Sequence, residues 1–365
     1  MRRNLLADKV QFGISVAGIA LAVFLISFLL SLFQGWKFNV GRFVEHVDAD
    51  VWVARDGTTD FLNAASILPA GMKQELASLS SVESVDALIV RPMNFNVGDE
   101  EFDLHLIGYE VDGGAGGPSN ITQGKETPGE HEIIVDRAYL KKAGIRLGDR
   151  IESFDQELEV VGVSTGGDFI FSQTAFVSLQ GARSFLGMEG LTTFYLLHLG
   201  QNADREAVAA EVEERFAGVV AITSEEFAAA TRDRIMRNIV PILIVILALA
   251  FVVGVAITGL TIYNTTVEKA REFGILKAIG FTNGYLFRLV LEQSLVTGLL
   301  GFLIGVGLTI GAAQFVSDLV PQFVTLVRWQ DILLVLGTTF MMTVLAALLP
   351  VRRITAVDPV AVFKA

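Results

Sequence analysis

The sequence TTVEKAREFGILKAIG, from Thr265 to Gly280, is a charged stretch between two long apolar ones. Ile239–Tyr263 precedes it without a charged residue, and Leu289–Val316 follows it with Glu292 as its only charge. Apolar segments of this length predict membrane-spanning helices. Within the charged stretch, apolar residues recur mostly at three- and four-residue spacing, which predicts a short amphipathic helix. We expect such a helix to lie along a membrane face or to dock on a partner.

The composition of the 365-residue chain is typical of a membrane protein. Its hydrophobic residues make up 52% of the chain and its mean hydropathy is +0.53, whereas soluble domains are roughly 45–50% apolar. A cleaved secretory signal has an apolar core of about 7–15 residues, so the longer first run predicts a retained span, with a cleaved signal as the alternative. The runs long enough to span a bilayer are Val10–Phe33, Ile239–Tyr263, Leu289–Val316 and Ile332–Val351.

Charge is distributed unevenly along the chain. Residues 41–234 hold 33 acidic and 15 basic residues, a net charge of −18, while the remainder holds 7 and 13, a net charge of +6. Basic residues gather before the first span, between the second and third spans, and after the fourth. The positive-inside rule therefore places both termini and the central charged stretch in the cytoplasm, and residues 41–234 outside. An acidic outer domain also argues against nucleic-acid binding, which requires basic patches.

The spans divide the chain into consecutive segments, and mixed strand and helix patterns predict an α+β fold for the large outer one. These segments are a cytoplasmic N-terminus with the first transmembrane helix (1–40), an extracytoplasmic domain ending in a helix (41–234), the second transmembrane helix (235–264), a cytoplasmic helix (265–285), the third transmembrane helix (286–316), an outer loop (317–331), the fourth transmembrane helix (332–351) and a cytoplasmic tail (352–365).

Several elements of the outer domain can be predicted individually. We expect a helix over Pro69–Leu79 with the proline in its first turn, paired strands over Val85–Val97 and Glu101–Tyr109, and a loop at Gly113–Pro118. Near the end of the domain, Ser224 is expected to begin a helix that continues without a break through Arg237 into the second span, with Pro241 as the position where a kink would occur. Motion of that span would then reach the outer domain directly.

The third span is rich in glycine, which lets helix backbones approach closely in lipid. Two pairs have the small-xxx-small spacing, so we expect a helix contact within the subunit or across a dimer. The alternative is that glycine is simply frequent in membrane helices. The candidate packing residues are Gly298, Gly301, Gly305, Gly307 and Gly311.

The sequence contains no convincing catalytic or cofactor pattern. Gly124-Lys125 is followed by Glu126 and does not fit a phosphate-binding loop. If the chain is part of a pump, ATP would have to be bound by a separate subunit. Gly162–Gly166 matches G-x-S-x-G, but the residues that follow read as loop and strand, whereas a nucleophile elbow requires a helix. The four histidines lack metal-ligand spacing and the chain has no cysteine, so we expect no metal site. Glu292 in the third span has either a structural role or a role in proton transfer.

Two motifs resemble a known family. The pattern EKAREFGILKAIG, residues 268–280, is similar to the cytoplasmic coupling helix of the FtsX/MacB/LolC-type permeases, which are membrane subunits of mechanotransmitting ABC transporters and include DevC-like and HrtB-like exporters. The closing sequence LPVRRITAVDPVAVFKA, residues 349–365, resembles the end of those permeases. The resemblance implies an α-helical membrane protein with four transmembrane helices and a MacB-like α+β domain between the first two.

The resemblance also implies a function and partners. The chain would be a non-catalytic permease in a bacterial cell membrane, coupling ATP hydrolysis by a separate ABC ATPase to export of an amphipathic substrate such as a lipid, lipoprotein, peptide or haem-like molecule. A second permease copy, preferably identical, and membrane lipids would be its other partners, with ATP and magnesium bound by the ATPase. The residues implied in ATPase coupling are Glu268, Arg271, Glu272, Phe273, Gly274, Leu276, Lys277 and Gly280.

Two alternatives stay open at this point. FtsX-like proteins of the same architecture transmit a signal to a cell-wall hydrolase and transport nothing, although the size of the outer domain favours export. Asp233 and Met236, three residues apart before the second span, resemble an acid and a methionine proposed as haem contacts in haem-exporting relatives. The plain interpretation of this pair is a solvated aspartate and an interfacial methionine.

Overall fold

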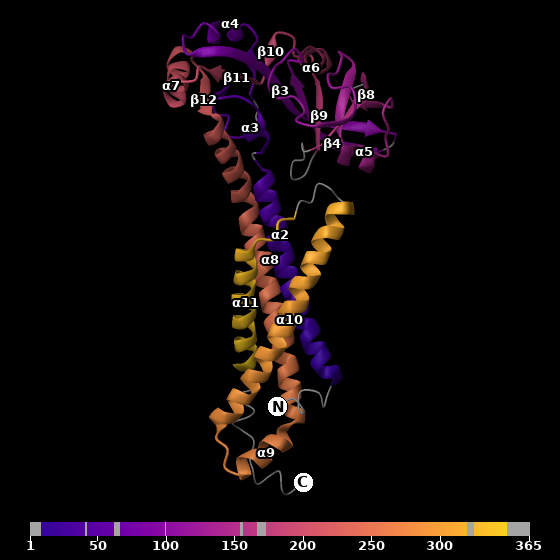
Figure 1. Ribbon diagram of the computed structural model, residues 1–365, viewed down its shortest axis with the longest axis vertical. Helices are drawn as coiled ribbons and strands as arrows, with labels where there is room; N and C mark the ends of the chain where they lie inside the picture. The colour runs from indigo at the N-terminus through magenta and orange to yellow at the C-terminus, as the bar shows by residue number, and fades with distance from the viewer. Residues whose placement is uncertain are drawn as a thin grey trace. The chain divides into compact units, whose positions relative to one another are not determined.

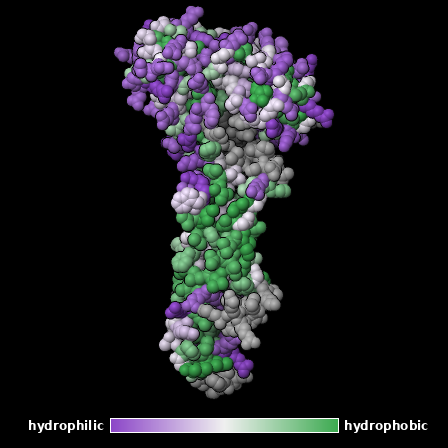
Figure 2. Space-filling model, viewed as in Figure 1, coloured by the Kyte–Doolittle hydropathy of each residue, from purple (hydrophilic) through white to green (hydrophobic). Residues whose placement is uncertain are grey.

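The computed structural model describes residues 9–40, 42–61, 66–98, 100–153, 156–165, 173–319 and 325–348. The chain divides into two compact units by its internal contacts. The helical unit comprises Met1–Gly35, Ile239–Leu319 and Thr325–Ala365, and the α+β unit comprises Trp36–Asn238 and Val320–Val324. On the face that Figure 2 shows, hydrophobic residues predominate over the middle of the helical unit and hydrophilic residues predominate on the α+β unit.

Long helices that lie side by side form the helical unit (Figure 1). It contains α9 (Ala270–Ala278), α10 (Asn283–Leu319) and α11 (Trp329–Leu348), together with most of α2 (Lys9–Asn39) and of α8 (Ser224–Glu268), whose other ends belong to the α+β unit. Four of those described, α2, α8, α10 and α11, are long and apolar enough to cross a membrane. Ile19, Phe302 and Met342 belong to their shared core. Leu260, Leu303 and Phe340 point outward and are more than half exposed.

The predicted glycines of α10 separate into two groups. A Cβ atom on Gly305 would lie 2.7 Å from the carbonyl oxygen of Ala20 in α2, and one on Gly298 would lie 2.5 Å from Thr343 in α11. Gly301 likewise faces α2. Gly307 and Gly311 are exposed, and no described atom lies within 4 Å of a Cβ built on either. Three glycines therefore pack helices within the unit, while two leave a surface open.

A mixed sheet organises the α+β unit. The described residues form a 10-stranded sheet in the order β12-β1-β11-β3-β4-β9-β6-β8-β5, with β7 pairing β3 and β8. Neighbours are antiparallel except in the β4–β9 and β6–β8 pairs. The bounds are β1 (Val51–Arg55), β3 (Val82–Val97), β4 (Glu100–Tyr109), β5 (Ile121–Gly124), β6 (Glu132–Asp136), β7 (Arg150–Ser153), β8 (Gln156–Ser164), β9 (Gln173–Ser178), β11 (Phe194–Leu199) and β12 (Val219–Thr223); β2 (Leu68–Pro69) pairs separately with β10 (Leu191–Thr192).

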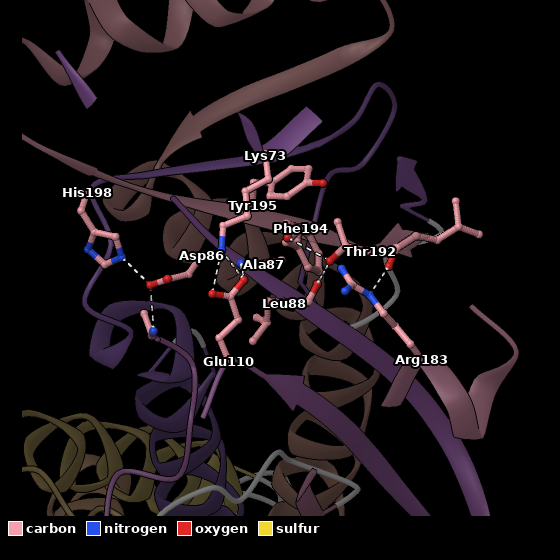
Figure 3. A network of polar contacts seen from close by, with 12 residues as sticks. Lys73, Asp86, Ala87, Leu88, Glu110, Arg183, Thr192, Phe194, Tyr195 and His198 are labelled. Atoms are coloured by element: carbon pink, nitrogen blue, oxygen red, sulfur yellow. Dashed lines mark hydrogen bonds and ion pairs between the residues drawn. The ribbon is translucent and has the colours of Figure 1, made fainter. Parts of the chain in front are cut away.

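The long strand β3 joins the two halves of this sheet. Its first part, Val82–Leu88, pairs with β11, and its second part, Ile89–Val97, pairs with β4. A network of polar contacts connects the strands at this junction (Figure 3). Within it Asp86 contacts His198 of β11 at 2.9 Å, and Glu110 after β4 accepts hydrogen bonds from Lys73 at 2.5 and 2.7 Å.

Short helices cover the sheet. They are α3 (Arg42–His46), α4 (Met72–Leu76), α5 (Arg137–Ala143), α6 (Leu179–Leu186) and α7 (Arg205–Arg215). Leu76, Tyr139, Phe185 and Val212 of α4 to α7 join one core cluster. A second core cluster contains residues of α3 and of the first turns of α8.

The structure confirms the pairing predicted for β3 and β4 and the unbroken helix α8, which passes through Pro241. The helix predicted over Pro69–Leu79 is wrong at both ends, since α4 covers only Met72–Leu76. Pro69 lies instead in β2, opposite Leu191, and its carbonyl oxygen accepts a 2.6 Å hydrogen bond from Tyr195. These contacts with distant strands outweigh the local preference of proline for a first helical turn.

We expect Trp52→Ala to destabilise the α+β unit by about 3 kcal/mol, because a large buried aromatic side chain would leave a cavity. Trp52 is 1% exposed and its ring centroid lies 5.4–5.7 Å from those of Phe61, Phe194 and Phe227. Exchange of the β1 and β11 amides, followed by mass spectrometry, should accelerate about a hundredfold. Trp52→Phe should cost only about 1 kcal/mol, since the indole N–H has no partner in the described structure. Equal effects of the two variants would contradict this account.

Candidate functional site

The charged stretch forms the turn between α8 and α10, at one end of the helical unit (Figure 1). The expected helix over Thr265–Gly280 is wrong in its first turn, because α8 continues to Glu268 and α9 begins at Ala270. The hydroxyl groups of Thr265 and Thr266 donate to carbonyl oxygens one turn earlier, at 2.9 and 2.7 Å, within the continuing α8. Lys269, with φ −86° and ψ 8°, separates the two helices.

The inner side of α9 is anchored to both neighbouring helices. Phe273 is 6% exposed and packs in one cluster with Leu286 and Val290 of α10. Ile262 of α8 and Leu276 of α9 pack against that cluster. Burial of Phe273 therefore fixes the position of α9 relative to the ends of two long helices, and its side chain is not available to a partner.

A glycine ends α9. Gly280 has φ +104°, and its N–H donates to the Lys277 carbonyl at 3.0 Å while that of Phe281 donates to the Leu276 carbonyl at 3.1 Å. This pair of bonds is the Schellman motif, in which glycine is favoured because the left-handed backbone strains other residues. Thr282 then starts the turn into α10, with its carbonyl oxygen accepting from the Leu286 N–H at 3.3 Å.

Gly280→Ala is expected to weaken the end of α9 by about 1 kcal/mol, because alanine at a positive φ is strained. Amide exchange over residues 279–282 should become about fivefold faster. The matched control is Gly284→Ala in the first turn of α10, where a Cβ meets only Thr282 Oγ1 at an ordinary 3.9 Å. This control should slow exchange or leave it unchanged, since alanine favours a helix. Faster exchange in the control would show that any added methyl disturbs the turn.

The outer side of α9 and the turn after it expose apolar side chains beside charged ones. We call this surface the α9 face. Ile279 is 71% exposed, and the rings of Phe281 and Tyr285 lie against each other with centroids 4.7 Å apart. The α9 face consists of the exposed residues Arg271, Glu272, Ile275, Ile279, Phe281 and Tyr285. Such a mixed apolar and charged patch is typical of a protein contact.

The structure sorts the residues implied in coupling by exposure. Glu268, Arg271, Glu272 and Gly280 are exposed, Leu276 and Lys277 are half-buried, and Phe273 and Gly274 are buried. Sequence reasoning did not identify Ile275, Ile279, Phe281 and Tyr285 as exposed residues of this surface. The signal that could have found the first two is their spacing from Arg271, since residues four apart lie on one side of a helix.

The other residues singled out in the sequence lie outside the α9 face. Glu292 accepts a 2.9 Å hydrogen bond from Arg288 one turn earlier. Asp233 is exposed whereas Met236 is buried, so only the aspartate of that pair is accessible. Ser164 ends β8, and residues 166–172, on which the interpretation of the G-x-S-x-G match depends, lie outside the described residues. Among the residues that the structure describes, no group of three His, Asp or Glu side chains could hold a metal ion.

The fold and the turn together define a class of protein. The apolar helices, the α+β unit inserted between the first two of them, and the α9 face are those of a membrane protein with a large extramembrane domain. Two family models match the chain: the MacB-like periplasmic core domain over residues 12–215 and the FtsX-like permease C-terminal domain over residues 244–359. The chain therefore belongs to the FtsX/MacB-type ABC transporter permeases, as its coupling and closing motifs predicted.

Individual relatives cover different shares of the chain. An uncharacterised ABC transporter permease of Mycobacterium bovis is 23% identical over 357 residues, 97% of this chain and 95% of that protein. One from Methanocaldococcus jannaschii is 25% identical over 231 residues, 59% of this chain and 57% of its own length. The solved periplasmic region of MacB from Actinobacillus actinomycetemcomitans has 13% identity and a TM-score of 0.37, covering 54% of this chain and 95% of that structure.

Proposed function

We propose that this permease is the membrane subunit of an ABC exporter, and that a separate ATPase docks on the α9 face. The observation that carries the proposal is the contrast between the two sides of α9. Its outer side exposes Ile279 and Arg271, while its inner side buries Phe273 against α8 and α10. A force applied to the outer side would move the ends of both helices together.

The second part of the proposal is that movement of α9 is transmitted along α8. This helix runs continuously from Ser224 to Glu268. At its start the Ser224 N–H donates to the Asp50 carbonyl at 3.0 Å, Phe227 is buried in the second core cluster, and Arg234 forms a 3.1 Å ion pair with Asp60. We infer that movement of α9 is delivered through α8 to the α+β unit, which is the mechanical coupling expected of the family.

The charge asymmetry supports the membrane arrangement that we propose. The acidic α+β unit lies outside, α9 and both termini lie in the cytoplasm, and α2, α8, α10 and α11 are the four spans. Gly307 and Gly311 leave an exposed small-residue surface on α10. Such a surface favours close helix contact in lipid, so we assign it to a second, identical permease copy.

We propose an amphipathic export substrate, such as a lipid, lipoprotein, peptide or haem-like molecule. The competing function is signal transmission to an extracytoplasmic cell-wall hydrolase, as in FtsX-like proteins. The α+β unit extends from Trp36 to Asn238, and this size favours export.

ATP hydrolysis by the reconstituted complex separates these functions. The permease would be purified with its ATPase in lipid, and the rate measured against added haem, lipids and lipopeptides, with Glu272→Ala as the coupling variant. Stimulation by one class of ligand that Glu272→Ala abolishes is the expected result. A rate that ignores every ligand but responds to an added outside protein would establish signal transmission instead.

A further inference from the structure

The long helices differ in how they connect to the α+β unit. The boundary between the two units falls within α2, after Gly35, and within α8, after Asn238. By contrast, α10 and α11 lie entirely in the helical unit. In the α+β unit, Arg232 of α8 forms an ion pair with Glu45 of α3, the next helix after α2. A movement that α8 delivers to the α+β unit therefore carries the end of α2 with it.

Near that end, one side chain of α2 is bound to the start of α11. The Gln34 amide uses both of its ends: Nε2 donates to Asp331 Oδ1 at 3.2 Å, and Oε1 accepts from Arg328 Nη1 at 3.4 Å. An amide can do both at once, whereas a guanidinium group only donates and a carboxylate only accepts. We call Gln34, Arg328 and Asp331 the α2–α11 clasp. All three residues belong to the helical unit.

Backbone hydrogen bonds fix the α11 side of the clasp. The Leu326 N–H donates to the Ser31 carbonyl of α2 at 3.0 Å. The Arg328 carbonyl accepts from the N–H groups of Asp331 and Ile332 at 3.1 and 3.2 Å, in the first turn of α11. The segment before α11 thus lies against α2, and α11 begins at the clasp.

The clasp differs in kind from the contact between α2 and α10. In that contact a Cβ on Gly301 would lie 2.6 Å from Ile19, and one on Gly305 would lie 2.7 Å from the Ala20 carbonyl oxygen, so the helices meet closely. Close packing of this kind cannot loosen without leaving a void. The clasp consists of side-chain hydrogen bonds, which water replaces at little net cost, and Arg328 is exposed. It can open and close while the glycine contact stays intact.

We propose that the α2–α11 clasp holds the α+β unit in its resting position and opens when α9 drives α8. The opening rests on the mechanical coupling proposed above, and the clasp adds a point of control to it. Since α2 moves with the α+β unit and α11 lies wholly in the helical unit, the closed clasp joins a moving helix to a stationary one. It thereby sets the force needed to move the α+β unit.

Gln34→Glu tests the clasp in the permease alone, in lipid nanodiscs. A glutamate at this position still accepts from Arg328 but repels Asp331, so the clasp should open. Amides of residues 326–332 should then exchange about tenfold faster. Adding Asp331→Asn supplies an amide that donates to the new carboxylate, and exchange should return to within about twofold of the wild-type rate. The exposed Gln330→Glu is the matched charge control and should not accelerate exchange, since an acid in the first turn of a helix is favourable.

The absence of cysteine from the chain allows the opening to be blocked directly. Gln34→Cys and Asp331→Cys, combined in one protein, would be joined by ethanediyl bismethanethiosulfonate. The control is the same protein treated with methyl methanethiosulfonate, which modifies both cysteines without joining them. In complex with the ATPase, the joined protein should hydrolyse ATP about tenfold more slowly than the control, because α2 cannot leave α11. Reduction with dithiothreitol should restore the rate.

The role of the clasp is overturned if Gln34→Glu leaves exchange of residues 326–332 unchanged, if Asp331→Asn does not restore it, or if the joined and control proteins hydrolyse ATP equally fast. Failure of the proposed function would be seen elsewhere. A wild-type permease that binds no ATPase would contradict docking on the α9 face, and the driven opening of the clasp with it. Failure of the clasp alone would leave ATPase binding and hydrolysis by the wild type intact.

Discussion

Gly305→Val is expected to force α2 away from α10 and to prevent most of the protein from reaching a folded state. The new Cβ would lie 2.7 Å from the Ala20 carbonyl oxygen and 2.7 Å from the Val23 side chain. A backbone atom and a β-branched side chain cannot move aside independently, so the cost should reach or exceed the roughly 3 kcal/mol at the upper end for overpacked cores. Folded yield, measured by size-exclusion chromatography of a fluorescent fusion, should fall about tenfold.

The matched control for this prediction is Gly307→Val, two residues along the same helix. Gly307 is exposed, and no described atom lies within 4 Å of its Cβ position. We expect wild-type yield of the folded subunit, with any loss confined to association of two copies. If Gly307→Val loses as much folded protein as Gly305→Val, the loss comes from placing valine in this helix at all. The clash with α2 is then not its cause.

This pair of glycines also shows what the sequence can and cannot predict. Gly301–Gly305 and Gly307–Gly311 have the same spacing, so both match the packing pattern equally well. Only the position of α2 decides that the first pair is buried. The long spans and the pairing of β3 with β4 could be predicted because each has a long or regular hydrophobic period. The short strands β2, β5 and β10 could not, because they depend on partners distant in the chain.

The same limit applies to the α9 turn. Its location could be predicted within a few residues from charge between two spans. The four-residue spacing of Arg271, Ile275 and Ile279 places these residues on one side of a helix. It does not tell which of the apolar residues Phe273 and Ile275 is buried. The cluster built by Leu286 and Val290 buries Phe273, while Ile275 remains 40% exposed. The neighbouring helices are therefore needed to tell the exposed side of α9 from its buried side.

Ile279→Asp is expected to abolish coupling to the ATPase while leaving the permease folded. The side chain is 71% exposed, so an acid there costs the isolated permease little. In a docked complex the same carboxylate would be buried without a partner, which is unfavourable by several kcal/mol, and a central apolar contact would be lost. Ligand-stimulated ATP hydrolysis and ATPase binding in lipid should each fall by about a hundredfold.

Two further variants distinguish loss of the docking contact from loosening of α9. Val267→Asp, in the last turn of α8 and 45% exposed, adds the same acid outside the α9 face and should preserve binding. Phe273→Ala should also weaken coupling, but by loosening α9 at a cost of about 3 kcal/mol, so its loss must be accompanied by faster amide exchange in α9. Ile279→Asp must act without that change. If Ile279→Asp retains wild-type ATPase binding, the ATPase docks elsewhere and the exposed side of α9 has another role.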